Sequence, residues 1–143
     1  MQPLKIGQAA REAGIGVETI RFYERKGLVT QPPRPIDGGA RDYGGDTLWR
    51  LKFISGAKKL GFSLAEIAEI LELRTAPNSE CVAMQARARK KRDEIQERID
   101  GLARLRNNLD ELIAACPGRG GIQNCSIVGA IERSSEKLAQ FRP

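Results

Sequence analysis

Apolar residues near the start of the chain recur at helical spacing. They run from Leu4 to Ala13 and stop before Gly14, which predicts a short helix with a glycine C-cap. The segment from Val17 to Gly27 repeats the pattern after a three-residue break. Two short helices joined by a glycine-containing turn predict a helix-turn-helix.

Residues 27–46 interrupt the helical pattern with three prolines and several glycines. Such a segment suits a hairpin-like wing, with Arg41 and Tyr43 near its returning strand. We expect the single tryptophan, Trp49, to pack this wing against the domain. Asp46 or Thr47 is the expected cap of the next helix.

Two more helices follow the predicted wing. Leucine, isoleucine and alanine form one stripe from Leu48 to Leu60, and a second stripe begins after Ser63. Ser63 and Glu66 have the spacing of a capping box. Residues 74–80, RTAPNSE, read as a linker.

Residues 79–115 contain neither proline nor glycine except Gly101, and their apolar positions follow a heptad. A helix of this length spans roughly 50 Å, longer than a domain of this size is wide. An antiparallel coiled-coil dimer therefore fits better than the alternative, a core helix within a monomer. The predicted interface residues are Ile95, Ile99, Leu102, Leu105, Leu109 and Leu112.

Charge and composition narrow the function. The 143 residues carry 24 Lys and Arg against 18 Asp and Glu, and residues 1–60 hold 11 basic and 6 acidic side chains. A basic excess in the helix-turn-helix region favours a nucleic-acid partner. The chain has no histidine, which excludes most nucleophilic and acid–base active sites and indicates that the protein is not an enzyme. No run is long enough to span a membrane, so we expect a cytoplasmic protein.

The expected DNA contacts lie on the second predicted helix, in the wing and on the helix after it. Arginine reads guanine or holds phosphate, and hydroxyl groups bind phosphate oxygens. Any one of the expected contact residues could instead be merely solvated, and Tyr23 could instead belong to the core. The set is Thr19, Arg21, Tyr23, Arg25, Arg41, Tyr43, Arg50 and Lys52. The basic run at residues 86–94 reads instead as the solvated face of the coiled coil and as a surface for salt bridges with the partner.

The three cysteines are Cys81, Cys116 and Cys125. On one continuous helix, Cys81 and Cys116 are roughly 50 Å apart and cannot share a metal within one chain. Antiparallel pairing about residues 98 and 99 brings Cys81 of one protomer beside Cys116 and Cys125 of the other. Three thiolates favour a soft, thiophilic ion over magnesium or calcium and differ from an ordinary four-ligand structural zinc site. The alternatives are buried free thiols and a Cys116 to Cys125 disulfide.

Together these patterns predict an all-α fold with a small β-hairpin wing. The predicted parts are a winged helix-turn-helix DNA-binding domain (1–75), a linker and long antiparallel coiled-coil dimerisation helix (76–116), and a metal-binding loop with a short C-terminal helix (117–143).

Three stretches of this chain resemble a known family. They are IGQAAREAGIGVETIRFYERKGL, then ARDYGGDTLWRLKFISGAKKLGFSLAEIAEILEL, then one cysteine before the long helix and C-x₈-C after it. Together they closely resemble the MerR family of metal-responsive transcription regulators, over nearly the whole chain to about Glu132. The three-cysteine pattern is most similar to that of mercury(II)-responsive members. Lead-, cadmium- and zinc-responsive members share the three positions.

The resemblance implies a function and a set of partners. A MerR-type homodimer represses a promoter without metal, and on binding metal it bends and untwists the double-stranded DNA so that RNA polymerase can use it. The implied effector is Hg(II), with Pb(II), Cd(II) or Zn(II) as alternatives. Two departures are the wing sequence ARDY, where Asp42 replaces a usual arginine, and the loop CPGRGGIQNCSIV.

Other function classes fit the sequence less well. A drug-sensing regulator needs a large C-terminal pocket domain, and only about 27 residues follow Cys116. An oxidant sensor with an iron–sulfur cluster normally needs four ligands. A soft-metal buffering or trafficking protein without promoter control needs neither the helix-turn-helix nor the wing.

Overall fold

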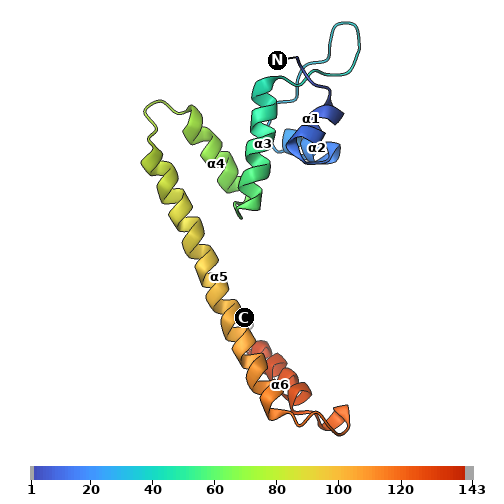
Figure 1. Ribbon diagram of the computed structural model, residues 1–143, viewed down its shortest axis with the longest axis vertical. Helices are drawn as coiled ribbons and strands as arrows, with labels where there is room; N and C mark the ends of the chain where they lie inside the picture. Colours follow the sequence, from blue (N-terminus) through green and yellow to red (C-terminus); the bar gives the residue numbers. More distant parts are fainter. Residues whose placement is uncertain (1, 141–143) are drawn as a thin grey trace. The chain divides into compact units, whose positions relative to one another are not determined.

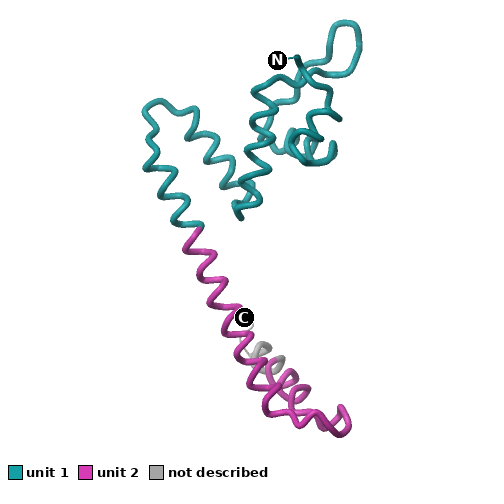
Figure 2. Tube along the Cα trace, viewed as in Figure 1, with its two compact units in different colours: residues 1–91 teal, residues 92–143 magenta. Residues whose placement is uncertain are grey.

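The computed structural model describes residues 2–140, with side chains described to residue 134. Its elements in chain order are α1 (Ile6–Ala13), α2 (Val17–Arg25), α3 (Gly45–Lys59), α4 (Leu64–Thr75), α5 (Cys81–Ala115), the 3₁₀ turn η1 (Ile122–Asn124) and α6 (Ser126–Gln140) (Figure 1). The chain divides into two compact units, residues 1–91 and 92–143, and the boundary falls within α5 (Figure 2).

The first unit opens with the predicted helix-turn-helix. Gly14 ends α1 with a φ of 72°, a left-handed conformation that glycine adopts at little cost. The Ile15 N–H then donates to the Ala10 carbonyl at 3.0 Å, which closes the turn before α2. Helices α1 and α3 pack together, as do α1 and α2 and α3 and α4. The most deeply buried large side chains of the core are Ile20, Leu51, Ile54 and Ile67.

The expected β-hairpin wing is not present among the described residues. Residues 30–42 contain no strand, and only one isolated antiparallel bridge joins Leu4 to Tyr43. Its two backbone hydrogen bonds measure 3.0 Å and 2.7 Å. Prolines 32, 33 and 35 have no N–H to donate to a hairpin ladder. The returning segment therefore pairs with the N-terminal segment, and Leu4 lies in this bridge before the first helix, which starts at Ile6.

Helices α3 and α4 confirm one predicted cap and correct another. Ser63 and Glu66 form the expected capping box, with hydrogen bonds of 2.8 Å and 3.2 Å. The N-cap of α3 is Gly44, so neither Asp46 nor Thr47 caps that helix. Trp49 stacks on Phe53, one turn away on α3, and carries Arg74 over its ring, which differs from the expected contact with the wing.

Two ion pairs join α4 to the first turns of α5. Lys91 Nζ lies 2.8 Å from Glu66 Oε1, and Arg87 pairs with Glu69. Both cations belong to the basic run 86–94 that was expected to be a solvated face. The Lys91 side chain is only 11% exposed, so this part of the run is an intramolecular contact.

Helix α5 is continuous from Cys81 to Ala115, which confirms the single long helix. In the second unit five of the six predicted interface residues are exposed apolar side chains, and Leu112 is partly exposed. Dimerisation through this face stays a prediction. No helix in the described part of the chain is long and apolar enough to cross a membrane.

Candidate functional site

A pocket of about 420 Å³ in the first unit is lined by four arginines. Its walls come from α2 and from the loop that follows it. The lining residues are Arg21, Glu24, Arg25, Gln31, Arg34 and Arg41. Four guanidinium groups face one carboxylate, so the pocket favours an anion. Guanidinium groups bind phosphate oxygens through paired N–H donors, which makes a nucleic-acid backbone a suitable occupant.

Arg41 supplies an independent sign that this pocket takes a ligand. Its Nε is buried and has no hydrogen-bond partner among the residues that the structure describes. A buried donor without an acceptor is costly and rare in folded proteins. An anion in the pocket would supply the missing acceptor.

Tyr43 contacts one of the residues that line the arginine pocket, Glu24. Its ring is buried, and its hydroxyl donates to Glu24 Oε2 at 3.1 Å. Burial, followed by the neighbouring Glu24 carboxylate, raises the pKa of Tyr43 to about 12. The phenol therefore stays protonated and holds the Glu24 carboxylate, which lines the pocket. The expected contact of Tyr43 with DNA stays a prediction.

The remaining expected DNA contacts are scattered, and several have intramolecular partners. Thr19 and Tyr23 line a separate hollow between α2, the end of α3 and the start of α4, and the Tyr23 ring is buried. Arg50 Nε donates to the Leu28 carbonyl at 3.0 Å, and Lys52 Nζ lies 3.9 Å from Glu12.

Sequence reasoning missed Arg34 and Gln31 in the arginine pocket. Arg34 stands between prolines in the sequence PPRPI, and proline-rich loops hold their backbone in a restricted conformation. A cation in such a loop, directly after α2, was the available signal. Asp42, the departure in the wing, pairs with Lys5 at 2.6 Å and does not line the pocket.

The second unit brings two cysteines together. Cys116 follows the end of α5, Cys125 precedes α6, and both line a loop cavity of about 320 Å³. The N–H groups of Val128 and Ile127, in the first turn of α6, donate to the Cys125 sulfur and hold the pKa of this thiol below its usual range. The adjacent Cys116 thiol acts in the same direction.

Cys81 opens α5 as an exposed thiol of the first unit. Within the described part of a single chain, no three metal-binding side chains of Cys, His, Asp or Glu come together. One protomer thus assembles two of the three expected ligands, and the three thiols are free.

Comparison with known proteins shows to which family this chain belongs. Residues 4–73 match the family described as MerR HTH family regulatory protein, and residues 48–112 match the MerR DNA-binding family. A mercuric resistance operon regulatory protein from Serratia marcescens is 39% identical over 136 residues, covering 95% of this chain and 92% of the relative. The chain belongs to the MerR family.

Solved MerR-family structures share this fold. A lead(II) complex of a transcription regulator from Ralstonia metallidurans has a TM-score of 0.76 and 29% identity, covering 90% of this chain and 98% of that one. A mercury(II) complex of a dual-function MerR regulator from Bacillus megaterium has a TM-score of 0.71 and 33% identity, covering 90% and 99%. The protein is a DNA-binding transcription regulator of the MerR family, and its relatives are regulators, not enzymes.

Proposed function

We propose that this MerR-family protein is a mercury(II)-responsive regulator that switches a resistance promoter from repressed to active. The observation that carries the proposal is the thiol pair of Cys116 and Cys125 on one loop. Support comes from relatives that are mercuric resistance regulators and from a relative solved with mercury(II).

The donor set of the loop suits a soft metal ion. Cys116 and Cys125 would hold Hg(II) together with the partner subunit's Cys81, so that one homodimer contains two equivalent sites. Sulfur donors favour thiophilic ions over oxygen-seeking ions, and the ion would supply a covalent-strength link between the protomers. The α6 N–H groups that favour the Cys125 thiolate prepare this ligand for binding.

Dimerisation through α5 is the second part of the proposal. Ile99, Leu102 and Leu105 expose more than half of their surface along this helix, an apolar stripe that a monomer leaves in water. Antiparallel pairing would cover the stripe and bring each Cys81 to the partner's loop.

DNA binding would use α2 and the arginine pocket. We infer that Arg21, Arg25, Arg34 and Arg41 hold the phosphate backbone while α2 lies in the major groove. A metal-dependent change at Cys81, which opens the helix joined to this unit, would alter the spacing of the two DNA-binding units and distort the promoter for RNA polymerase.

Two alternatives are tested beside mercury. A Pb(II)-, Cd(II)- or Zn(II)-responsive regulator of the same family is favoured by the likeness to the lead(II) complex. A soft-metal buffering or trafficking protein would use the thiols without promoter control. The arginine pocket and its buried Arg41 donor favour a regulator over such a protein.

The deciding experiment is metal-dependent footprinting and reporter induction with mercury, lead, cadmium and zinc salts. We expect mercury to induce at the lowest concentration and Cys125→Ser to abolish induction while DNA binding persists. Gln123→Ala, two residues before this ligand, exposed and outside the lining of the cavity, is the matched control and should respond like the wild type. If another ion induces most strongly, that ion replaces mercury as the proposed effector. Metal binding without any DNA footprint would favour the buffering or trafficking protein.

A further inference from the structure

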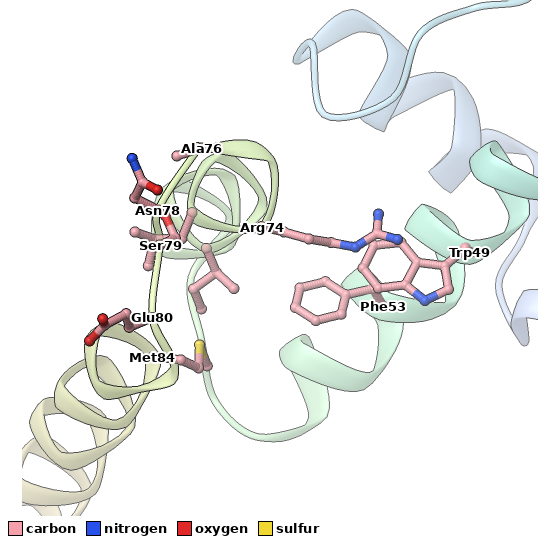
Figure 3. A pocket seen from close by; sticks show the side chains of 10 residues that line it. Trp49, Phe53, Arg74, Ala76, Asn78, Ser79, Glu80 and Met84 are labelled. Atoms are coloured by element: carbon pink, nitrogen blue, oxygen red, sulfur yellow. The ribbon is translucent and has the colours of Figure 1, made fainter.

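Four large apolar side chains of the first unit are exposed among the residues that the structure describes. They are Ile36, Trp49, Leu60 and Val82. Trp49 is covered on one face by the Arg74 guanidinium, whose carbon lies 3.5 Å from the ring centroid (Figure 3). Ile36 is the most exposed of the four, at 108% against 68% for Leu60. A partner that covers this side chain removes apolar surface from water, which favours binding.

A closed turn holds Ile36 at the tip of the loop between α2 and α3. The Gly38 N–H donates to the Pro35 carbonyl at 3.0 Å, so Ile36 and Asp37 occupy the two central positions of the turn. Gly38 has a φ of 77°, a conformation that glycine adopts at little cost. Asp37 Oδ1 accepts a hydrogen bond from the Gly39 N–H at 2.9 Å. The exposure of Ile36 therefore belongs to an ordered turn, residues 35–38, which we call the loop tip.

The loop tip follows the arginine pocket directly in the sequence. Arg34, two residues before Ile36, lines this pocket, and two residues of chain span at most roughly 7 Å. The minor groove of B-DNA is about 6 Å wide, so a side chain at this distance from a bound phosphate can reach the groove beside it. Because α2 is proposed to lie in the major groove, the groove on the other side of that phosphate is the minor groove.

We propose that Ile36 enters the minor groove of the promoter DNA, beside the phosphate that Arg34 holds. Its side chain covers the apolar carbons of the deoxyribose rings, as apolar side chains of other minor-groove proteins contact DNA. A sugar contact distinguishes no base pair, so Ile36 contributes to affinity and to the placement of the loop rather than to sequence choice. This inference rests on the proposed use of the arginine pocket for phosphate binding.

Fluorescence anisotropy with a labelled operator duplex measures the contribution of Ile36. Ile36→Ser should weaken binding about tenfold without changing the slope of log K against log salt, because no cation is lost. Ile36→Leu keeps the apolar volume and should retain most of the affinity. Asp37→Asn is the matched control at the neighbouring position, since it keeps the acceptor for the Gly39 N–H and should bind at least as tightly as the wild type. Circular dichroism checks that each variant is folded.

Hydroxyl-radical footprinting locates the contact, because these radicals cleave DNA at deoxyribose carbons that the minor groove exposes. The wild type should protect a short stretch of sugars in the minor groove beside the site of α2. At saturating protein concentration, Ile36→Ser should lose this protection while the remaining footprint persists. Arg34→Gln tests the pocket separately and should reduce the salt slope by about one.

Two outcomes overturn the proposal for Ile36. They are an unchanged affinity of Ile36→Ser and a loss of affinity with an unchanged cleavage pattern. If Arg34→Gln reduces the salt slope in the same experiments, either outcome removes Ile36 alone from the DNA interface. An unchanged salt slope in Arg34→Gln would instead refute phosphate binding by Arg34, and with it the basis of this inference.

Discussion

Glu66 Oε1 accepts hydrogen bonds from both the Ser63 N–H and Lys91 Nζ, each at 2.8 Å. One carboxylate oxygen therefore caps α4 and holds the first turns of α5 against it. The Lys91 ammonium also lies 5.8 Å from the centroid of the buried Phe62 ring. Through these contacts α5 begins as part of the DNA-binding unit.

Loss of this ion pair should destabilise the first unit. Lys91→Met keeps the length and apolar stem of the side chain but leaves Glu66 without its ammonium partner. We expect unfolding free energy to fall by about 1–2 kcal/mol, between the values typical of surface and buried ion pairs. Urea unfolding, monitored through Trp49 fluorescence, measures this change in unfolding free energy. Lys90→Met is the matched neighbour; equal midpoints for the two variants would contradict the role of Lys91.

Glu66 also predicts a pH dependence. The Lys91 contact, followed by the Ser63 N–H, lowers the pKa of Glu66 to about 2, from an ordinary value of 4.5. Because the folded state has the lower pKa, the contribution of this carboxylate is complete above about pH 4.5 and is lost as the pH falls toward 2. The difference in unfolding free energy between wild type and Glu66→Gln should shrink across that window. Urea titrations at several pH values measure this difference, and a difference independent of pH would refute the assignment.

Local sequence signals predicted much of the helical frame. Gly14 ends α1, and the Ser63 and Glu66 capping box starts α4, because each depends on neighbours within a few residues. The prediction of a hairpin wing failed because the pairing of this segment depends on a residue that is distant in the sequence. Tyr43 pairs with Leu4, a partner 39 positions away that no turn signal between Gly27 and Asp46 reveals.

In the candidate sites, too, features set by local sequence were predicted and features set by long-range packing were not. The sequence identified three arginines of the pocket from their helix and wing positions, but Arg34 and the support of Glu24 by Tyr43 depend on how the loop folds back. Likewise, the heptad of α5 was visible in the sequence, whereas the Lys91 contact with Glu66 depends on the packing of α4.

Arg41 should contribute to DNA affinity through the phosphate backbone. Arg41→Ala removes one cation from the arginine pocket, so it should weaken binding on all sequences and reduce the slope of log K against log salt by about one. Fluorescence anisotropy with a labelled operator duplex at several salt concentrations measures this slope. Lys59→Ala, at the exposed end of α3, is the control outside the pocket, and an equal effect of the two variants would remove Arg41 from the interface.

The apolar stripe of α5 predicts a dimer. Leu102 and Leu109 are 65% and 52% exposed, and an aspartate at each position would place charges in the proposed interface. Leu102→Asp combined with Leu109→Asp should give a monomer, which sedimentation equilibrium measures. This monomer should also have lost its affinity for DNA. Asn108→Asp adds a charge to an exposed polar position and should leave the dimer intact. A dimer that survives the double substitution would place the interface elsewhere.

The sharing of cysteines between protomers can be tested with mixed dimers. A Cys81→Ser chain retains Cys116 and Cys125, and a Cys116→Ser/Cys125→Ser chain retains Cys81. Neither variant alone can form a complete three-thiolate site. A heterodimer of the two contains one complete site only if the ligands come from different protomers, since a site within one chain would leave both chains incomplete. With the chains tagged differently and the heterodimer purified, mercury stoichiometry and ultraviolet thiolate-to-metal absorption should show about one ion per heterodimer. The differently tagged Cys81→Ser pair is the matched control: its loops keep two thiolates each, so it should lack the absorption of three-thiolate coordination. A heterodimer with the same spectrum as this control would exclude the shared site.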